Sequence, residues 1–254
     1  MRDEVVLITG GSSGIGLATA EAFARRGARV WLTARGEEKL ARAAASLSRP
    51  VHTLPTDVED QGSLDRLAAT IREREGRLDV LVNSAGQLDL ASADRGALEI
   101  AERLMRVNYL GLARTVATTL PLLRLGSRRS IVNLSSFVGR LVPPYWSAYA
   151  ASKHAVQAYS HALRQELRRE GFHVALVLPG PVLSPMTENL LRTPMYPVPV
   201  GVPVLPPDRV AEAILRCVFR RRVEVTVPGR FGPLLRLASA FPTLVDLLYR
   251  RYPS

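Results

Sequence analysis

Short aliphatic segments alternate with longer amphipathic segments along most of the chain. Seven short segments are rich in aliphatic and β-branched residues, at 5–9, 28–33, 51–55, 79–82, 130–134, 173–178 and 223–227. Their apolar residues run almost continuously, which predicts strands that are buried on both faces. Apolar residues at helical spacing follow at 15–26, 37–47, 63–74, 98–123, 147–169 and 208–220. We therefore predict an α/β fold, a doubly wound Rossmann-type sheet of seven parallel strands with helices on both faces.

Two segments depart from this alternation. Residues 179–207 hold nine of the 18 prolines between a strand and a helix, and a loop of that length predicts a function, here a substrate loop or lid. Residues 229–254 place apolar side chains at mostly helical spacing, which predicts a C-terminal helical extension. We expect it to pack against the body or a second subunit; contact with a membrane surface is the less favoured alternative. The 254 residues then form a single domain, 1–254.

The net charge of +11 raises the question of an anionic partner. Of the 34 basic residues only Lys39 and Lys153 are lysines, and the arginines are scattered. Nucleic-acid-binding proteins usually show a clustered basic face or a recognisable motif, so we expect no nucleic-acid partner. A basic surface would still attract a phosphorylated cofactor or an acidic substrate.

The cysteine content and the N-terminus bear on location. Cys217 lies in an apolar segment with no second cysteine to pair with, which predicts a buried thiol. The first strand begins at Val5, which leaves no room for a signal peptide, and no uncharged, proline-free run is long enough to span a bilayer. We expect a cytoplasmic protein.

A glycine-rich turn joins the first strand to the first helix. Residues 9–16 read Thr-Gly-Gly-Ser-Ser-Gly-Ile-Gly. Small residues there let the backbone approach a pyrophosphate at the helix N-terminus. The spacing differs from the common Gly-x-Gly-x-x-Gly fingerprint, so the turn alone is also compatible with a plain tight connection.

A tyrosine and a lysine stand four residues apart in a predicted helix. This spacing places Tyr149 and Lys153 on one helix face. An ammonium near a phenol lowers the phenol's pKa from about 10, which makes the tyrosine a usable acid or base. Such pairs are also common on helix surfaces, but this lysine is one of only two in the chain. Ser136, after the strand 130–134, would offer a hydroxyl to the same crevice, with Ser135 as the alternative.

In their order and spacing, the glycine turn, Ser136, Tyr149 and Lys153 resemble the short-chain dehydrogenase/reductase (SDR) family, in its single-domain branch. The resemblance runs over about 5–227. The segment 83–86, Asn-Ser-Ala-Gly, is similar to the family's Asn-Asn-Ala-Gly, with Ser84 as a departure, and Ser184 stands where the family usually has Thr. The resemblance implies four catalytic residues: Asn108, Ser136, Tyr149 and Lys153. It implies a cofactor site formed by Gly10, Ser12, Ser13, Gly14, Ile15, Gly16, Arg35, Asp57, Val58, Asn83, Ala85, Gly86, Tyr149, Lys153, Pro179, Gly180, Val182 and Ser184.

The resemblance also implies a mechanism. Tyr149 would give a proton to the carbonyl oxygen that Ser136 holds, while the nicotinamide delivers hydride to the carbon. Lys153 would lower the Tyr149 pKa and bind the ribose hydroxyls, and Asn108, at a helix kink, would position a water for proton replacement. No metal is expected. His154 and His161 lie seven residues apart, roughly 10 Å along a helix, which is too far to share an ion.

The end of the second strand bears on the choice of cofactor. NAD-preferring relatives usually have Asp where Ala34 stands, and Arg35 resembles the basic residue with which many NADP-dependent relatives bind the 2′-phosphate. Ser13 occupies the place of a second basic residue that relatives often have. We therefore expect NADP(H) to be preferred, with NAD(H) as the alternative.

Together these residues predict an NADP(H)-dependent oxidoreductase that transfers hydride between the nicotinamide and a carbonyl or secondary alcohol. The alternatives are an NAD-linked alcohol dehydrogenase and a non-catalytic nucleotide sensor, against which the intact set of catalytic residues argues. We expect an apolar substrate, and a homodimer or homotetramer joined partly through the helix 149–169. The apolar residues expected to contact the substrate are Met186, Leu190, Leu191, Met195, Tyr196, Val198 and Val204.

Overall fold

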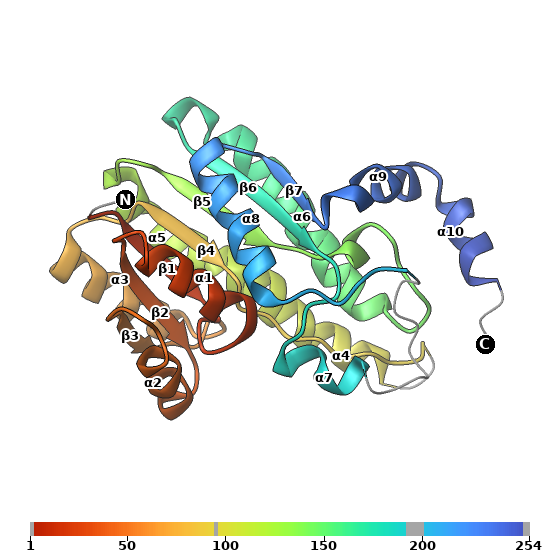
Figure 1. Cartoon of the computed structure of the whole chain (residues 1–254), viewed down its shortest axis with the longest axis horizontal. Coiled ribbons are helices and arrows are strands. Elements are labelled where there is room, and N and C mark those ends of the chain that lie inside the picture. Colours follow the sequence, from red (N-terminus) through yellow and green to blue (C-terminus); the bar gives the residue numbers. More distant parts are fainter. Residues whose placement is uncertain (1–2, 94–95, 192–200, 251–254) are drawn as a thin grey trace.

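The fold is known from a computed structural model, which describes residues 3–93, 96–191 and 201–250. Its centre is a seven-stranded sheet whose neighbouring strands are all parallel, in the order β3-β2-β1-β4-β5-β6-β7 (Figure 1). The strands are β1 (Val5–Thr9), β2 (Arg29–Ala34), β3 (His52–Pro55), β4 (Val80–Asn83), β5 (Ser130–Leu134), β6 (His173–Pro179) and β7 (Glu224–Val227). The strand order reverses between β1 and β4, which is the point where such sheets bind ligands. The predicted doubly wound α/β fold is confirmed.

Helices cover both faces of the sheet. One layer holds α1 (Gly14–Ala24), α2 (Glu37–Ala45) and α8 (Pro207–Arg220), and the other holds α3 (Gln61–Glu75), α5 (Leu112–Leu125) and α6 (Ser147–Glu166). Within β1, Val6 and Ile8 pack in the core of the first layer, whereas Val5 and Leu7 pack in the core of the second. Successive side chains of a strand point to opposite faces, so a strand between two helix layers is mostly apolar on both faces.

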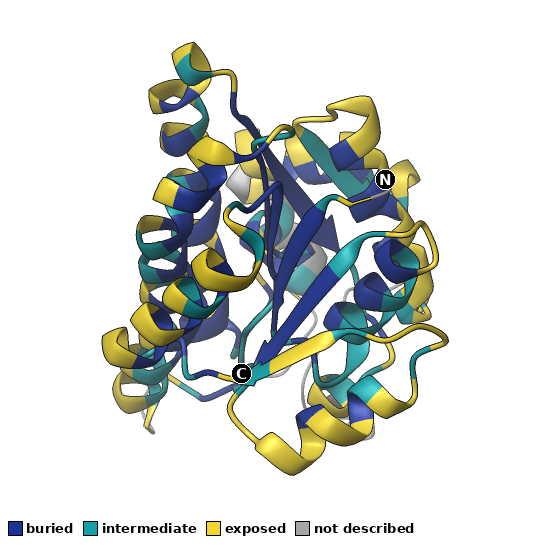
Figure 2. Cartoon of the chain, turned by 90° about the vertical axis from the view of Figure 1, so that its left-hand side faces the viewer, coloured by how far each residue is buried: buried dark blue, intermediate teal, exposed yellow. Residues whose placement is uncertain are grey.

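The edge strand β3 does not follow this rule. The central strands are buried along their length (Figure 2), but His52, Thr53 and Pro55 are exposed. The expectation of burial on both faces is therefore wrong for β3. An edge strand has one neighbour only, and part of its surface faces solvent.

A π-helical segment interrupts the helix predicted at 98–123. The chain forms α4 (Ala97–Leu104), then the π-helix η1 (Met105–Gly111), then α5. Asn108 lies in η1, and its Nδ2 donates to the Gln87 carbonyl at 3.0 Å and to Ser152 Oγ at 2.9 Å. These contacts come from residues distant in sequence, so the spacing of apolar residues could not reveal them. π-Helical turns occur frequently at functional sites.

The proline-rich segment contains a short helix. Within 179–207 the chain forms α7 (Pro185–Leu191), where the sequence predicted only a loop. Met186 and Val204 are exposed, as residues of a substrate-facing surface would be. Met195, Tyr196 and Val198 lie outside the described residues, and the side chains of Leu190 and Leu191 are likewise not described.

The C-terminal extension forms α9 (Gly232–Ala240) and α10 (Pro242–Tyr249), as the sequence predicted. Leu235 and Ala238 are buried in the same core as β1 residues Val5 and Leu7, which confirms packing against the body. Other apolar residues of the segment remain exposed: Leu234, Leu237 and Phe241. Among the described helices, none has both the length and the hydropathy of a transmembrane span.

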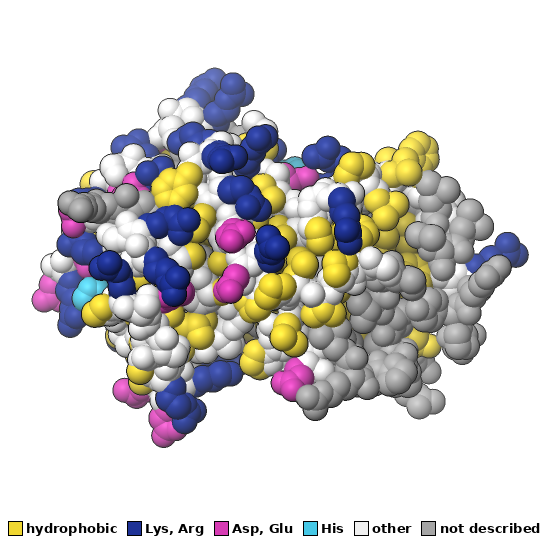
Figure 3. All heavy atoms as spheres, in the orientation of Figure 1, with side chains coloured by type: hydrophobic (Ala, Val, Ile, Leu, Met, Phe, Trp, Pro, Cys, Tyr) yellow, Lys and Arg dark blue, Asp and Glu magenta, His cyan; other side chains and the backbone are white. Residues whose placement is uncertain are grey.

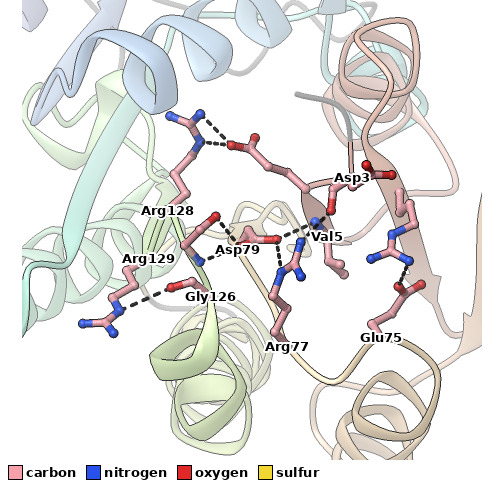
Figure 4. Close-up of polar contacts among 11 residues, drawn as sticks. Asp3, Val5, Glu75, Arg77, Asp79, Gly126, Arg128 and Arg129 are labelled. Atoms are coloured by element: carbon pink, nitrogen blue, oxygen red, sulfur yellow. Dashed lines mark hydrogen bonds and ion pairs between the residues drawn. The ribbon is translucent and has the colours of Figure 1, made fainter.

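A buried carboxylate ties together the strand ends opposite the glycine turn. Asp79, which precedes β4, is fully buried. Its Oδ2 accepts from the backbone N–H of Val5 at 2.8 Å, and its Oδ1 accepts from the backbone N–H of Ser127 at 2.7 Å. Arg77 Nε donates to Asp79 Oδ2 at 3.1 Å, as Figure 4 shows. The carboxylate thus links β1, β4 and the chain that leads into β5.

Candidate active site

A cavity of about 580 Å³ lies along the carboxyl ends of β1, β2 and β4. This volume is within the usual range for small-molecule and cofactor sites. Eleven of the residues predicted for the cofactor line it: Gly10, Ser12, Ser13, Gly14, Ile15, Arg35, Asp57, Val58, Ala85, Gly86 and Ser184. Met186, expected to contact the substrate, also lines it, together with residues that sequence reasoning missed: Thr33, Gly36, Lys39, Thr56, Glu59, Gln87, Leu88, Val107 and Pro185. The cavity lies where the strand order reverses, so the predicted location of the ligand crevice matches the structure.

The glycine turn leaves room for a ligand because side chains cannot fit there. Gly10 has φ +69°, and a Cβ on it would lie 2.7 Å from the backbone N of Ala85. A Cβ on Gly16 would lie 2.3 Å from the carbonyl oxygen of Gly10. The helix α1 begins at Gly14, so its free N–H groups are at the cavity wall. This arrangement can bind a phosphate by backbone donors, which fits the pyrophosphate of a dinucleotide.

The end of β1 is also bonded to the end of β4. Thr9 Oγ1 accepts from the backbone N–H groups of Ser84 and Ala85, both at 3.2 Å. This contact holds two walls of the cavity together. Sequence reasoning missed Thr9, because its partners lie about 75 residues away in the chain.

Seven predicted cofactor residues do not line the cavity: Tyr149 and Lys153, described below, and Gly16, Asn83, Pro179, Gly180 and Val182. Asn83 is buried, its Nδ2 donates to Asn133 Oδ1 at 2.9 Å, and its Oδ1 has no hydrogen-bond partner. Gly180 lies so close to Phe137 that an added Cβ would come 3.2 Å from its ring. Val182 forms an isolated bridge with Leu205. These residues pack around the cavity without facing it.

Tyr149 and Lys153 lie in the first turns of α6, and both are buried. The side chain of Tyr149 is hydrogen-bonded to that of Ser136. Lys153 Nζ donates to the Leu134 carbonyl at 3.2 Å and lies 5.6 Å from the centroid of the Tyr149 ring. The structure therefore brings together Ser136, Tyr149 and Lys153, although none of them is in the wall of the 580 Å³ cavity.

Gly86 connects this cluster to the cavity. It lines the cavity, and a Cβ on it would lie 3.2 Å from Asn108 Oδ1 and 3.5 Å from Lys153 Nζ. Asn108 Oδ1 also accepts from the backbone N–H of Gln87 at 2.7 Å. Asn108 and Lys153 thus stand directly behind the cavity wall at Gly86. A side chain at position 86 would crowd Asn108 and come into contact with Lys153.

Burial controls the pKa values in the cluster. It raises the pKa of Tyr149 to about 12, against the opposing effect of the hydrogen bond with Ser136. It lowers the pKa of Lys153 to about 8. The lowering of the Tyr149 pKa by Lys153 stays a prediction, because the raised value results from burial, which outweighs the hydrogen bond with Ser136.

The structure distinguishes the two serines after β5. Ser135 Oγ donates to the Lys153 carbonyl at 3.0 Å and accepts from Gln157 Nε2 at 3.1 Å, so it is occupied in holding α6 against the sheet. Ser136 is instead the partner of the Tyr149 side chain. The geometry favours Ser136 as the serine that meets a substrate oxygen.

Two cations meet at the β2 end of the cavity. Arg35 follows β2, and Lys39 is four residues later on α2, so both side chains reach the cavity lined also by Gly36. Neither cation forms an ion pair within the described residues. Sequence reasoning counted Lys39 without assigning it a role. Its place in the first turn of the helix that follows β2, close to Arg35 in sequence, was the signal that could have found it.

The sequence predicts that the histidines of α6, His154 and His161, do not share a metal ion. His154 Nδ1 lies 3.0 Å from the Ala150 carbonyl, within its own helix. In the ranges that the structure describes, no three His, Cys, Asp or Glu residues are grouped as metal ligands.

Comparison with known proteins decides the family. The profile described as short chain dehydrogenase matches residues 4–194. The chain belongs to the short-chain dehydrogenase family. The solved structure of a short chain dehydrogenase/reductase family protein superposes on this chain with a TM-score of 0.79 and is 28% identical in sequence. The match covers 89% of this chain and 95% of the other chain.

Curated relatives agree with this assignment. The zebrafish (Danio rerio) dehydrogenase/reductase SDR family member 7B is 32% identical over 96% of this chain and 84% of its own length. A dehydrogenase/reductase SDR family protein 7-like from Anopheles gambiae is 35% identical over 75% of this chain, a match that spans 63% of that relative. This short-chain dehydrogenase is an SDR oxidoreductase, and its family implies a nicotinamide cofactor.

Proposed function

We propose that this enzyme is an NADP(H)-dependent reductase that converts the carbonyl group of an apolar substrate into a secondary alcohol, with the reverse oxidation also accessible. The observation that carries the proposal is the Tyr149 side chain, buried and hydrogen-bonded to Ser136, beside Lys153, which lies directly behind the cavity wall at Gly86. The arrangement supplies a proton donor and a polar anchor for one oxygen atom.

The residues present suit a dinucleotide. The backbone of the glycine turn would hold the pyrophosphate, and the two free N–H groups of Lys153 would bind the ribose hydroxyls near Gly86. When bound, the nicotinamide supplies the hydride. The protein supplies the orientation of the substrate and the proton.

Each of the four catalytic residues has a separate task in this proposal. Ser136 holds and polarises the substrate oxygen, and Tyr149 donates its proton to that oxygen. Lys153 stabilises the tyrosinate that results. Asn108 positions the Gln87 backbone and Ser152, whose hydroxyl donates to the Tyr149 carbonyl at 2.7 Å, and so aligns the start of α6.

The pKa of Tyr149 supports the reducing direction. With a pKa of about 12, the phenol keeps its proton at neutral pH and is ready to act as an acid. Oxidation of an alcohol would need the phenolate first. The Lys153 pKa of about 8 leaves the ammonium mostly charged at neutral pH, where it can stabilise that phenolate as it forms.

The test is a substrate screen that follows NADPH absorbance with ketones, 3-oxoacyl thioesters, steroids, retinoids and sugars. We expect turnover with one or more hydrophobic carbonyl compounds. Binding of NADPH without turnover of any class would favour the nucleotide sensor instead. Turnover only with NAD and an alcohol would favour the NAD-linked dehydrogenase.

The preference for NADP(H) rests on Arg35 and Lys39, with Ala34 in place of a carboxylate. Charge-assisted contacts with phosphate contribute about 1.5–3 kcal/mol, so Arg35→Ala should reduce kcat/KM for NADPH roughly 10- to 100-fold and leave that for NADH nearly unchanged. Lys39→Ala should show a smaller change in the same direction. A wild-type preference for NADH would contradict the cofactor choice, and unchanged discrimination in both variants would contradict these residues.

The apolar substrate site is proposed to lie under the segment 179–207. Its described residues Leu183, Met186 and Val204 are exposed apolar side chains, and Met186 also lines the cavity. We expect amide hydrogen exchange in this segment to slow when NADPH and substrate bind. Strong protection already in the ligand-free protein would argue against a lid, and a preference for small polar sugars would argue against an apolar site.

A homo-oligomer through α6 is also proposed. Exposed positions on this helix recur at helical spacing and are mostly small or uncharged: Ala151, His154, Ala158, His161, Ala162 and Gln165. Small side chains allow a symmetry-related helix to approach closely. Light scattering at micromolar concentration should give a dimer or tetramer, and a monomer would refute the proposal. A cytoplasmic location and a single domain over 1–254 stay predictions.

A further inference from the structure

A second cavity is unusually rich in arginine. It has a volume of about 350 Å³ and lies between α8, β7 and α9, and it shares no residue with the cofactor cavity. Four arginines line it: Arg216, Arg220, Arg222 and Arg236. In Figure 3 basic side chains gather over α8, and hydrophobic ones lie beside them toward α9.

The charges of this arginine cavity are poorly compensated. The one carboxylate that lines it, Glu224, already accepts from Arg140 Nη2 at 2.6 Å. In the described part of the chain, Arg216 forms only a long ion pair, in which its Nη1 lies 4.0 Å from Glu212 Oε2. Arg220, Arg222 and Arg236 have no ion pair within the described residues. Because like charges repel, an anion bound among these guanidinium groups would be stabilised.

The helix α9 adds an apolar surface next to these charges. Leu234, Leu237 and Phe241 are exposed by 45%, 47% and 55%, although each could have packed in a core. Leu234 and Leu237 lie about 60° apart around α9, and Phe241 is the residue that caps the C-terminal end of this helix. Arg236 lies on the same helix and lines the arginine cavity. A small free phosphate would use the arginines and leave this apolar side unexplained.

A second copy of the chain suits the surface poorly. In a twofold symmetric dimer the same patch meets itself, so the arginine cavity would face its own copy. A lipid surface has both complementary features, because anionic phosphate groups lie directly above an apolar layer.

We propose that the arginine cavity and the exposed side of α9 bind the surface of a membrane that contains anionic phospholipids. The guanidinium groups contact phosphate headgroups, while Leu234, Leu237 and Phe241 enter the boundary between headgroups and acyl chains. Such contact needs no transmembrane segment. It is independent of the reaction at Tyr149.

The test is co-sedimentation of the full chain with vesicles of phosphatidylcholine alone or with 30% phosphatidylglycerol. We expect the protein to sediment with the anionic vesicles only, and less so as salt is raised from about 0.1 M to 0.5 M. The triple variant Arg220→Gln, Arg222→Gln, Arg236→Gln should partition roughly a hundredfold more weakly, since each arginine near a charged membrane contributes about fivefold. Leu237→Ser should weaken partition without changing its dependence on salt.

The matched control is the triple variant Arg42→Gln, Arg49→Gln, Arg72→Gln. These arginines are also exposed but do not line the arginine cavity, and the control lowers the net charge by the same amount as the test variant. Thermal unfolding checks that all variants are folded. Equal loss in the control variant would show a general charge effect and overturn the site. Lack of sedimentation with anionic vesicles would also overturn the proposal. This holds even if inorganic phosphate stabilises the protein through these arginines, because the site would then bind phosphate and not a membrane.

Discussion

Tyr149→Phe should lower kcat for carbonyl reduction by about 10²- to 10⁴-fold, the usual range for loss of a general acid. The substitution keeps the ring, which packs edge-on against Trp146 with centroids 5.9 Å apart, and removes only the hydroxyl bonded to Ser136. NADPH binding should change little, because the ribose contacts assigned to Lys153 remain. Steady-state kinetics and a fluorescence titration with NADPH separate the two effects.

The control for this variant is Tyr159→Phe. Tyr159 is on the same helix and is also partly buried, and it packs against Tyr109 with ring centroids 6.0 Å apart. Burial raises its pKa to about 12 as well, yet its hydroxyl has no place in the proposed mechanism. Turnover of Tyr149→Phe close to that of Tyr159→Phe would remove Tyr149 from the role of acid.

Asp79→Ala should cost about 3 kcal/mol of unfolding free energy, the largest stability effect that we expect from a single polar side chain. The variant leaves the backbone N–H groups of Val5 and Ser127 without their acceptor in a buried site. Urea unfolding at pH 7 measures the change. Asp65→Ala, at an exposed position of α3, is the matched control and should change stability by less than about 0.5 kcal/mol.

The stabilisation by Asp79 should depend on pH in a defined direction. Burial acts to raise the pKa of this carboxyl group, but hydrogen bonds from Val5, Ser127 and Arg77 outweigh burial and hold the pKa below its ordinary value. Asp79 therefore binds a proton more readily in the unfolded chain than in the folded protein. The stabilisation by Asp79 is complete above the ordinary pKa of the carboxyl group. It is lost as pH falls through the lower pKa that Asp79 has in the folded protein. The stability difference between wild type and Asp79→Asn should shrink as pH falls below about 4. A difference that stays constant or grows in acid would contradict the assignment.

The sequence by itself determined the layers of the fold and identified the residues of the proposed catalytic cluster. The strands β1 and β5 begin and end where the sequence predicted, because a strand between two helix layers is mostly apolar on both faces. The spacing of Tyr149 and Lys153 was sufficient to place them on one helix face, since helix geometry is local. The glycine turn was recognisable because only small residues fit there.

Only the tertiary structure decided features that depend on residues distant in the chain. The choice between Ser135 and Ser136 follows from the position of Gln157 and Tyr149 on α6. The raised pKa of Tyr149 follows from the desolvation of its hydroxyl, and burial is a property of the packed whole. The arginine cavity forms where α8, β7 and α9 meet, and the sequence does not show how these elements are placed relative to one another. Local patterns record which face of an element is apolar, but they do not record which charges meet across elements.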